Sequence, residues 1–243
     1  MKKTIYTLLI LFFAQITLSA QDLTIREEKR GFDGDTYPCL LVKVEDMAAT
    51  QSAFEDFAKK ELDFKFKKSG KTMLVAEKVS LNSIIPLRRG DFLVRLDTEN
   101  SEMGFAFRMG YDYVLNTNDY REEMPRFRQL IGRFLLNFYE AGLTKQIETA
   151  EKEIKSIDSE LKSNAKENAK LAKQIEKNEK TIRKADENQR ALLENENIAT
   201  RNAQETLAKQ EAHLRQRLVE LQGQVGALKQ QINALRQQAA QGS

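Results

Sequence analysis

The fold of this chain is decided by a repeat near its carboxyl end, where residues 214–239 read LRQRLVELQGQVGALKQQINALRQQA. This spacing of apolar residues is typical of a coiled-coil seam, because it places them all on one face of a helix. A single small domain cannot cover so long a stripe, so we expect the helix to pair with a second helix. The apolar side chains recur at alternating intervals of four and three residues: Leu214, Leu218, Leu221, Val225, Leu228, Ile232, Leu235 and Ala239.

The preceding stretch, from Leu143 to Ala185, carries a repeat of its own. Three asparagines, Asn164, Asn168 and Asn178, occupy the same helix face; polar residues in a seam lower its stability but can fix its register. The two repeats are one residue out of phase, so the polar stretch of about residues 186–210 must absorb the shift through stutters or a turn. We predict a helical coiled coil over residues 143–240 and a tail at 241–243. The apolar seam residues of this first repeat are Ile147, Ile154, Ile157, Leu161, Leu171, Ile175 and Ile182.

Charges beside the two repeats favour antiparallel pairing. Most residues that flank the first repeat are acidic, whereas the charged residues that flank the second are basic. Antiparallel pairing brings opposite charges together, and we expect Glu151 opposite Arg236 and Asp158 opposite Lys229. The same register places Ile175 on Leu214. One observation opposes this choice, because β-branched residues at one seam position and leucine at the other are typical of parallel dimers.

Two geometries satisfy antiparallel pairing. A turn near Glu194–Asn197 would make a hairpin within one chain, whereas one straight helix would pair with a second copy of the chain. The centre of the region lacks glycine and proline and keeps helix-forming residues such as Leu192 and Leu193, which favours the straight helix. Gly142, followed by Thr144 as an N-cap, marks the expected joint with the preceding domain.

The first twenty residues have the features of an export signal. Lys2 and Lys3 give a positive start, residues 5–16 form a mostly apolar run, and Leu18-Ser19-Ala20 fits the pattern before a cleavage point. The apolar run is shorter than the roughly 20 residues needed to span a bilayer. We therefore expect cleavage before Gln21, export across a bacterial inner membrane into the periplasm or medium, and no transmembrane segment after processing.

Residues 21–142 predict a small α+β domain. Segments with the two-residue period of strands lie at 23–25, 37–44, 64–67, 71–78, 92–97 and 103–108, and a turn is expected at Gly31–Asp35. One helix, capped by Asp46, should run to about Leu62, and another should begin at residues 119–125. This order predicts an antiparallel sheet with helices on one face. It resembles the TBP-like and helix-grip folds, in which a curved sheet wraps a long carboxy-terminal helix; no motif supports the resemblance, and it implies no function.

Candidate chemical sites are few. The only histidine, His213, falls on the solvent side of the seam and lacks partners at metal-ligand spacing. The only cysteine, Cys39, stands in an apolar run and is interpreted as a core residue. No nucleotide-binding, zinc or serine-hydrolase motif occurs. We therefore predict no catalytic, cofactor-binding or metal-ligating residues, and a net charge of +3 does not argue for nucleic acid.

Aromatic residues are concentrated before the helical region, and they leave two interpretations open. Their spacing is that of a strand packed on a helix, which favours a core, but part of the cluster could line a binding surface. These residues are Phe105, Phe107, Tyr111, Tyr113, Tyr120, Phe127, Phe134, Phe138 and Tyr139.

Together these patterns favour a non-enzymatic, exported envelope protein. A small binding or docking domain would be carried on a coiled-coil spacer, with a protein as its partner and with self-association or an intramolecular hairpin through residues 143–240. The alternative is a periplasmic holdase or assembly chaperone with helical arms. That alternative requires exposed apolar surface on the arms, where the sequence is dense in Lys, Glu, Gln and Asn.

Overall fold

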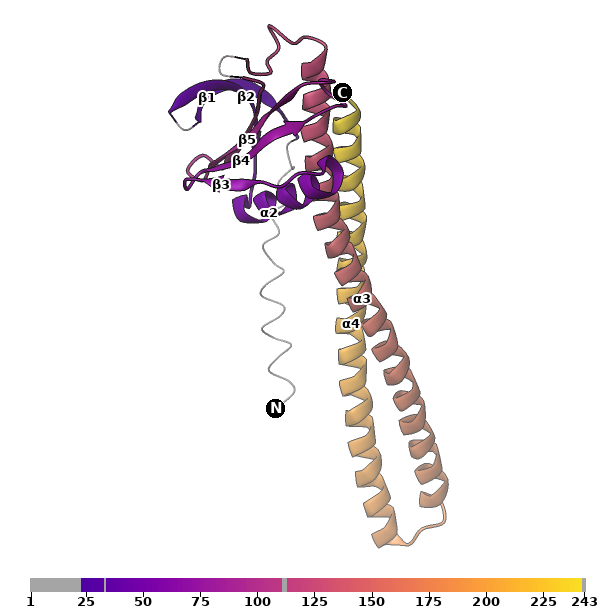
Figure 1. The fold of residues 1–243 in the computed structure, drawn as a ribbon. Coiled ribbons are helices and arrows are strands. Elements are labelled where there is room, and N and C mark those ends of the chain that lie inside the picture. The colour runs from indigo at the N-terminus through magenta and orange to yellow at the C-terminus, as the bar shows by residue number, and fades with distance from the viewer. Residues whose placement is uncertain (1–22, 33, 111–112, 242–243) are drawn as a thin grey trace. The chain divides into compact units, whose positions relative to one another are not determined.

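The computed structural model describes residues 23–32, 34–110 and 113–241 (Figure 1). The chain divides into two compact units: the first runs through Glu140 and takes in the residues from Asn233 onward, and the second is Ala141–Ile232. The predicted export signal lies outside the described residues. Within the part of the chain described, no helix is long and apolar enough to cross a membrane.

The first unit contains a sheet of six antiparallel strands in the spatial order β1-β2-β6-β5-β4-β3. It is an α+β unit, as the sequence predicted. The first strand, predicted at 23–25, is wrong: β1 begins only at Arg26, where its pairing with β2 starts opposite Leu41. β1 extends through Phe32, whose ring centroid lies 6.0 Å from that of Tyr37, so the expected turn at Gly31–Asp35 is shorter than predicted. The strands are β1 (Arg26–Phe32), β2 (Asp35–Lys43), β3 (Lys67–Ser69), β4 (Met73–Ser80), β5 (Arg89–Asp97) and β6 (Glu102–Arg108).

Helix α2 (Met47–Phe57) follows β2 and begins as predicted at Asp46, whose side chain accepts a hydrogen bond from the Ala49 amide at 2.9 Å. A π-helical turn, η1 (Ala58–Leu62), continues it to the predicted end. There Asp63 adopts a left-handed conformation, with φ of 57°, and stops the helix.

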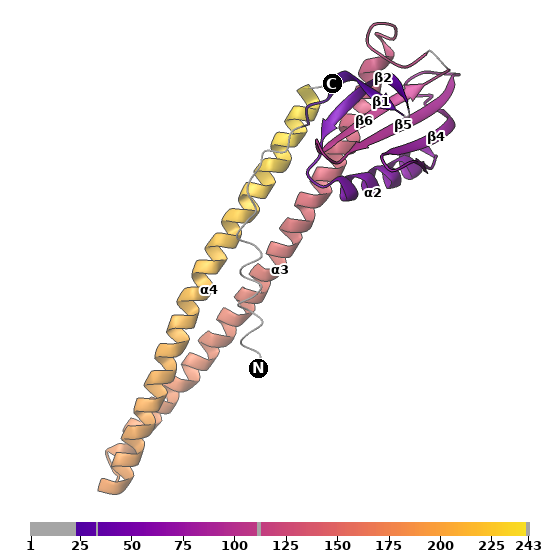
Figure 2. The same ribbon diagram turned by 90° about the vertical axis from the view of Figure 1, so that its left-hand side faces the viewer.

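The core of the first unit lies between one face of the sheet and two helices. Phe54 of α2 is fully buried, and its ring centroid lies 4.8 Å from those of Phe105 on β6 and Phe134 on α3 and 5.8 Å from that of Phe92 on β5. Both helices therefore cover the same face, which Figure 2 shows for α2. Burying each such side chain contributes about 1.5–3 kcal/mol to folding.

Helix α3 (Glu123–Ile182) begins within the predicted window and carries Pro125 in its first turn, where proline costs no hydrogen bond. The predicted joint at Gly142 lies within two residues of the division between the units at Glu140 and Ala141, but the helix start predicted at Thr144 is wrong, because α3 continues through both residues. A glycine inside a helix costs only about 1 kcal/mol relative to alanine, which the many other contacts of this helix outweigh.

Helix α4 (Glu187–Gln241) follows after a short turn at residues 183–186, and α3 and α4 lie side by side in the second unit (Figures 1 and 2). The straight helix favoured by the sequence is therefore wrong, and so is a turn at Glu194–Asn197. The turn is set by Asp186, whose side chain accepts a hydrogen bond from the Gln189 amide at 2.9 Å. An Asp followed three residues later by Gln is a capping pattern, and it is the local sequence signal for this turn.

Candidate functional site

The predicted seam residues lie along a row between α3 and α4. Ile147, Ile157 and Leu221 are buried, as are Val225, Leu228 and Leu235. Half-buried residues complete the row. On each helix, the buried and half-buried residues together follow the alternating spacing of four and three residues. These half-buried residues are Ile154, Leu161, Leu171, Ile175, Ile182, Leu214, Leu218 and Ile232.

Sequence reasoning missed that the row on α4 continues through the polar stretch. The four-three spacing extends back from Leu214 without interruption, so no stutter occurs in α4 and the turn absorbs the whole phase shift. Polarity hid these positions, since only two of them are apolar. They are Leu193, Asn197, Thr200, Gln204, Leu207 and Glu211, all buried or half-buried.

Two polar pairs lie within this row. The Asn178 amide donates a hydrogen bond to Asn197 Oδ1 at 3.0 Å, and both side chains are buried. Gln204 donates to Asn168 Oδ1, also at 3.0 Å. These bonds join residues of α3 and α4 in antiparallel order. Buried amides must find partners, so each pair penalises any register that separates it.

The predicted ion pairs are correct in sign but wrong in register. Lys229 pairs with Glu151 at 3.5 Å and not with Asp158, and Arg236 pairs with Glu140 at 2.6 Å and not with Glu151. The predicted register would place Glu211 opposite Asn178, where Asn197 lies, a difference of two heptads. A seven-residue repeat matches itself after such a shift, so apolar spacing and charge could not exclude it.

A further ion pair joins α3 and α4 at Arg217, whose guanidinium donates to Glu153 at 2.9 Å. Hydrogen bonding to Glu153 raises the pKa of Arg217 above its usual value. Both side chains remain partly exposed, so we attribute to this pair no more than about 1 kcal/mol.

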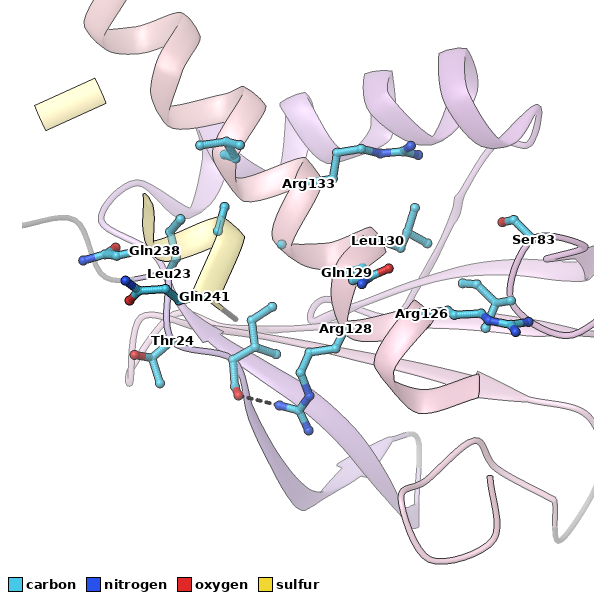
Figure 3. A pocket seen from close by; sticks show the side chains of 15 residues that line it. Leu23, Thr24, Ser83, Arg126, Arg128, Gln129, Leu130, Arg133, Gln238 and Gln241 are labelled. Carbon is cyan, nitrogen blue, oxygen red and sulfur yellow. Dashed lines mark hydrogen bonds between the residues drawn. The ribbon is translucent and has the colours of Figure 1, made fainter. Parts of the chain in front are cut away.

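A cavity lies in the first unit beside the amino-terminal turns of α3 (Figure 3). This cavity, called the cleft below, has a volume of about 870 Å³. Its walls come from the segment before β1, the loop after β4, α3 and the last turn of α4. The lining residues are Leu23, Thr24, Ile25, Ser83, Ile84, Arg126, Arg128, Gln129, Leu130, Gly132, Arg133, Leu136, Gln238, Ala239 and Gln241.

The floor of the cleft is apolar. Ile84 and Leu130 line it and are buried in the core below. Gly132 contributes no side chain, and a Cβ added there would stand 3.7 Å from Ile25 Cδ1, an ordinary van der Waals contact. Glycine at this position therefore keeps space in the cleft that a larger side chain would fill.

Three arginines line the rim, and they differ in their partners. Arg128 donates to the Ile25 carbonyl at 2.6 Å, the bond drawn in Figure 3, and so holds the segment before β1. Arg133 lies 3.9 Å from Glu61, with its guanidinium 5.8 Å from the centre of the Phe57 ring. Arg126 is exposed and makes no hydrogen bond or ion pair with any residue in the described ranges. Arg126 is thus the rim cation best able to meet an anionic group.

A smaller cavity, of about 440 Å³, lies on the opposite face of the sheet. Lys67, Lys68 and Arg108 line it. Arg108 already donates to Asp91 at 2.8 Å and to the Tyr37 hydroxyl at 3.2 Å, and these two bonds raise its pKa. These bonds join β6 to β2 and β5, so two of the five donors of Arg108 are engaged within the sheet.

Most of the aromatic cluster is core. Phe105, Phe107, Phe127, Phe134 and Tyr139 are buried, and Phe138 and Tyr120 are half-buried. Tyr113 is exposed, whereas Tyr111 lies outside the described residues.

The two candidate reactive side chains are placed as follows. Cys39 is 2 % exposed, and burial raises the pKa of its thiol to about 12. This pKa makes it a poor nucleophile at neutral pH. His213 is exposed on α4. Within the described ranges, no group of three or more His, Cys, Asp or Glu side chains could hold a metal ion.

Comparisons with known proteins add no relative. No protein-family model, curated protein or solved structure matches this chain.

Proposed function

We propose that this protein is a non-enzymatic envelope protein whose first unit docks a partner protein and whose helical hairpin acts as a spacer. The observation that carries the proposal is the cleft, which combines an apolar floor with the guanidinium of Arg126. Such a surface suits an extended segment that offers apolar and acidic side chains. The export signal expected at residues 1–20 supports a place in the bacterial envelope.

The finer fold belongs to this proposal. We infer that α3 and α4 form an antiparallel coiled coil, supported by the four-three burial of both helices and by polar and charged pairs between them. The sheet order, with α2 and α3 on one face, supports the resemblance to helix-grip folds. A hairpin closed by such a seam is stiff enough to serve as a spacer.

The test captures partners from an envelope lysate with the full chain and with cleft variants. Arg126→Glu should reverse the charge of the rim, and Gly132→Phe should fill the cleft, so both should lose the partner. Arg121→Glu is the matched control, because Arg121 is exposed and does not line the cleft. Gly132→Ala is the second control, since its Cβ makes only an ordinary contact.

We expect partner affinity to fall at least tenfold in the two cleft variants and to remain within about twofold in the two controls. Partners retained equally by all four variants would refute docking at the cleft. Partners lost equally with Arg121→Glu would show that net charge, and not the cleft, decides binding.

The chaperone function has one observation in its favour. Three large apolar side chains on α4 are exposed, namely Leu192, Ile198 and Val219. They are scattered singly along the helix, which is ordinary for a soluble surface. If these side chains bind unfolded proteins, the wild-type chain should suppress the aggregation of reduced insulin, and changing all three residues to glutamine should abolish this effect. A chain that does not suppress this aggregation would exclude the holdase.

A further inference from the structure

The two helices of the hairpin differ sharply on the sides that point away from the inter-helix row. On α3 the outermost position of each heptad holds lysine in five of six cases, with Ser159 as the exception. On α4 the equivalent positions hold a single lysine, Lys209, among asparagine, glutamine and glycine. The outermost lysines of α3 are Lys145, Lys152, Lys166, Lys173 and Lys180, all exposed.

Neighbouring outward positions of α3 extend this basic face. They add four further cations and only two carboxylates, Glu148 and Glu176, and the turn that follows α3 adds Arg183 and Lys184. Lys180 approaches Glu176 at 2.6 Å, but both remain largely exposed. The outward positions from Lys145 to Lys184 thus carry eleven cations against two carboxylates, and six further carboxylates of this stretch lie at the positions beside the inter-helix row. The further cations are Lys155, Lys162, Lys170, Lys177, Arg183 and Lys184, all exposed.

The geometry points to a flat anionic partner. Successive outermost positions lie about 10 Å apart along the helix and turn by only about 20° per heptad, so Lys166, Lys173 and Lys180 can meet one plane together. Between the outermost lysines stand small residues such as Ser156, Ser159 and Ala169, which allow close approach. We propose that this face of α3, called the lysine face, binds the surface of an anionic lipid bilayer.

The composition of the lysine face favours a bilayer over a nucleic acid or another linear polyanion. From Lys145 to Lys184 the outward positions contain no aromatic residue and only one arginine, so they lack the stacking and forked groups common in nucleic-acid sites. They also lack large apolar residues that would insert between lipids. Binding is therefore electrostatic, remains at the headgroup level and weakens as salt rises.

The test measures co-sedimentation of the full chain with vesicles. One set contains equal parts phosphatidylglycerol and phosphatidylcholine, and the other contains phosphatidylcholine alone. The neutral set reports any binding by the apolar amino-terminal run, which every variant shares. The test variant is Lys152→Gln with Lys166→Gln and Lys173→Gln. The matched control, Arg190→Gln with Lys209→Gln and Arg215→Gln, removes the same charge from exposed positions of α4.

Each lysine near an anionic surface strengthens binding about fivefold, so the test variant should bind the anionic vesicles roughly a hundredfold more weakly. The control should lose less than about tenfold, and circular dichroism should show the same helix content in both. Equal losses in the two variants would overturn the proposal, as would equal binding of wild type to both vesicle sets. Binding of dextran sulfate but not of anionic vesicles would also overturn it, in favour of a linear polyanion.

Discussion

The two units hold their cores together in different ways. In the first, the ring of Phe54 has five phenylalanine neighbours with centroids 4.8–6.2 Å away. In the second, the core is a single row, and Asn178 and Asn197 lie within it. A cluster packed on all sides accepts only one arrangement, whereas a heptad row fits equally well after a shift of whole heptads. Apolar area therefore stabilises the first unit, while polar pairs and a capped turn decide how the second is aligned.

The largest expected effect is in the aromatic core. Phe54→Ala should lower the free energy of unfolding of the first unit by about 3–5 kcal/mol, because it removes a fully buried ring and leaves a cavity. All six tyrosines precede residue 140 and the chain has no tryptophan, so tyrosine fluorescence in urea reports this unit. Leu87→Ala is the control: Leu87 is 99 % exposed and should change stability by less than about 0.5 kcal/mol. Equal effects would show that the phenylalanine cluster is not the core.

A smaller loss is expected in the row between α3 and α4. Leu221 is 2 % exposed and Val219, two residues away, is 68 % exposed. Leu221→Ala should cost about 2–3 kcal/mol. Val219→Ala should be neutral or stabilise by a few tenths of a kcal/mol, since alanine is the better helix former. Thermal melts followed by far-ultraviolet circular dichroism measure both, and a larger loss for Val219→Ala would mean that α4 is rotated.

The third prediction concerns replacement of asparagine by leucine at two positions of the row, where we expect opposite changes in the stability of the hairpin. Asn178→Leu should destabilise the hairpin by about 1–3 kcal/mol, because it strands the buried amide of Asn197. Asn164→Leu should stabilise it by about 1 kcal/mol, since the Asn164 Nδ2 is buried and finds no hydrogen-bond partner among the described residues. Chemical denaturation of the two variants is the measurement. If both variants were stabilised or both destabilised, the conclusion that the Asn178–Asn197 pair fixes the register would be contradicted.

The smallest effect at neutral pH concerns Cys39 in the first unit. Its folded pKa of about 12 lies above the ordinary value of 9.0, so the unfolded chain loses this proton first. The contribution of the thiol is fully present below about pH 9 and is lost as the pH rises toward 12. The stability difference between wild type and Cys39→Ala should therefore be constant up to about pH 9 and then shift against the wild type. A constant difference across this range would contradict burial of the thiol.

Much of the first unit could be predicted from its sequence because its signals are local. Alternating strand residues, the Asp46 cap and Pro125 each act within a few residues, and β2, β4, β5, β6 and the starts of α2 and α3 lie within about three residues of their predicted bounds. The strand predicted at 23–25 is wrong, and the one predicted at 64–67 shares only Lys67 with β3. The cleft could not be predicted, because Gln238 and Gln241 reach it from more than a hundred residues beyond Arg126.

In the hairpin, periodicity predicted which residues of α3 face the row but could not choose the partner residues on α4. The information was present in Asp186 and Gln189, which cap α4, and in Asn197, which faces Asn178. A capping pattern without glycine or proline is a weak signal, and a polar residue at a seam position looks like a gap in the repeat. The apolar spacing is a stronger signal than the capping pattern or the polar seam residue, but by itself it does not distinguish registers that differ by whole heptads.

The most direct test of this account is a cross-link between positions 178 and 197. In a Cys39→Ala background, Asn178→Cys combined with Asn197→Cys should be joined within one chain by a short bismaleimide, as shown by intact mass and by migration as a monomer. Asn178→Cys combined with Glu211→Cys should give little intramolecular product, because these residues are opposite only in the register two heptads away. A cross-link in the second pair but not the first, or a covalent dimer as the main product, would contradict the hairpin and the role of its polar pairs.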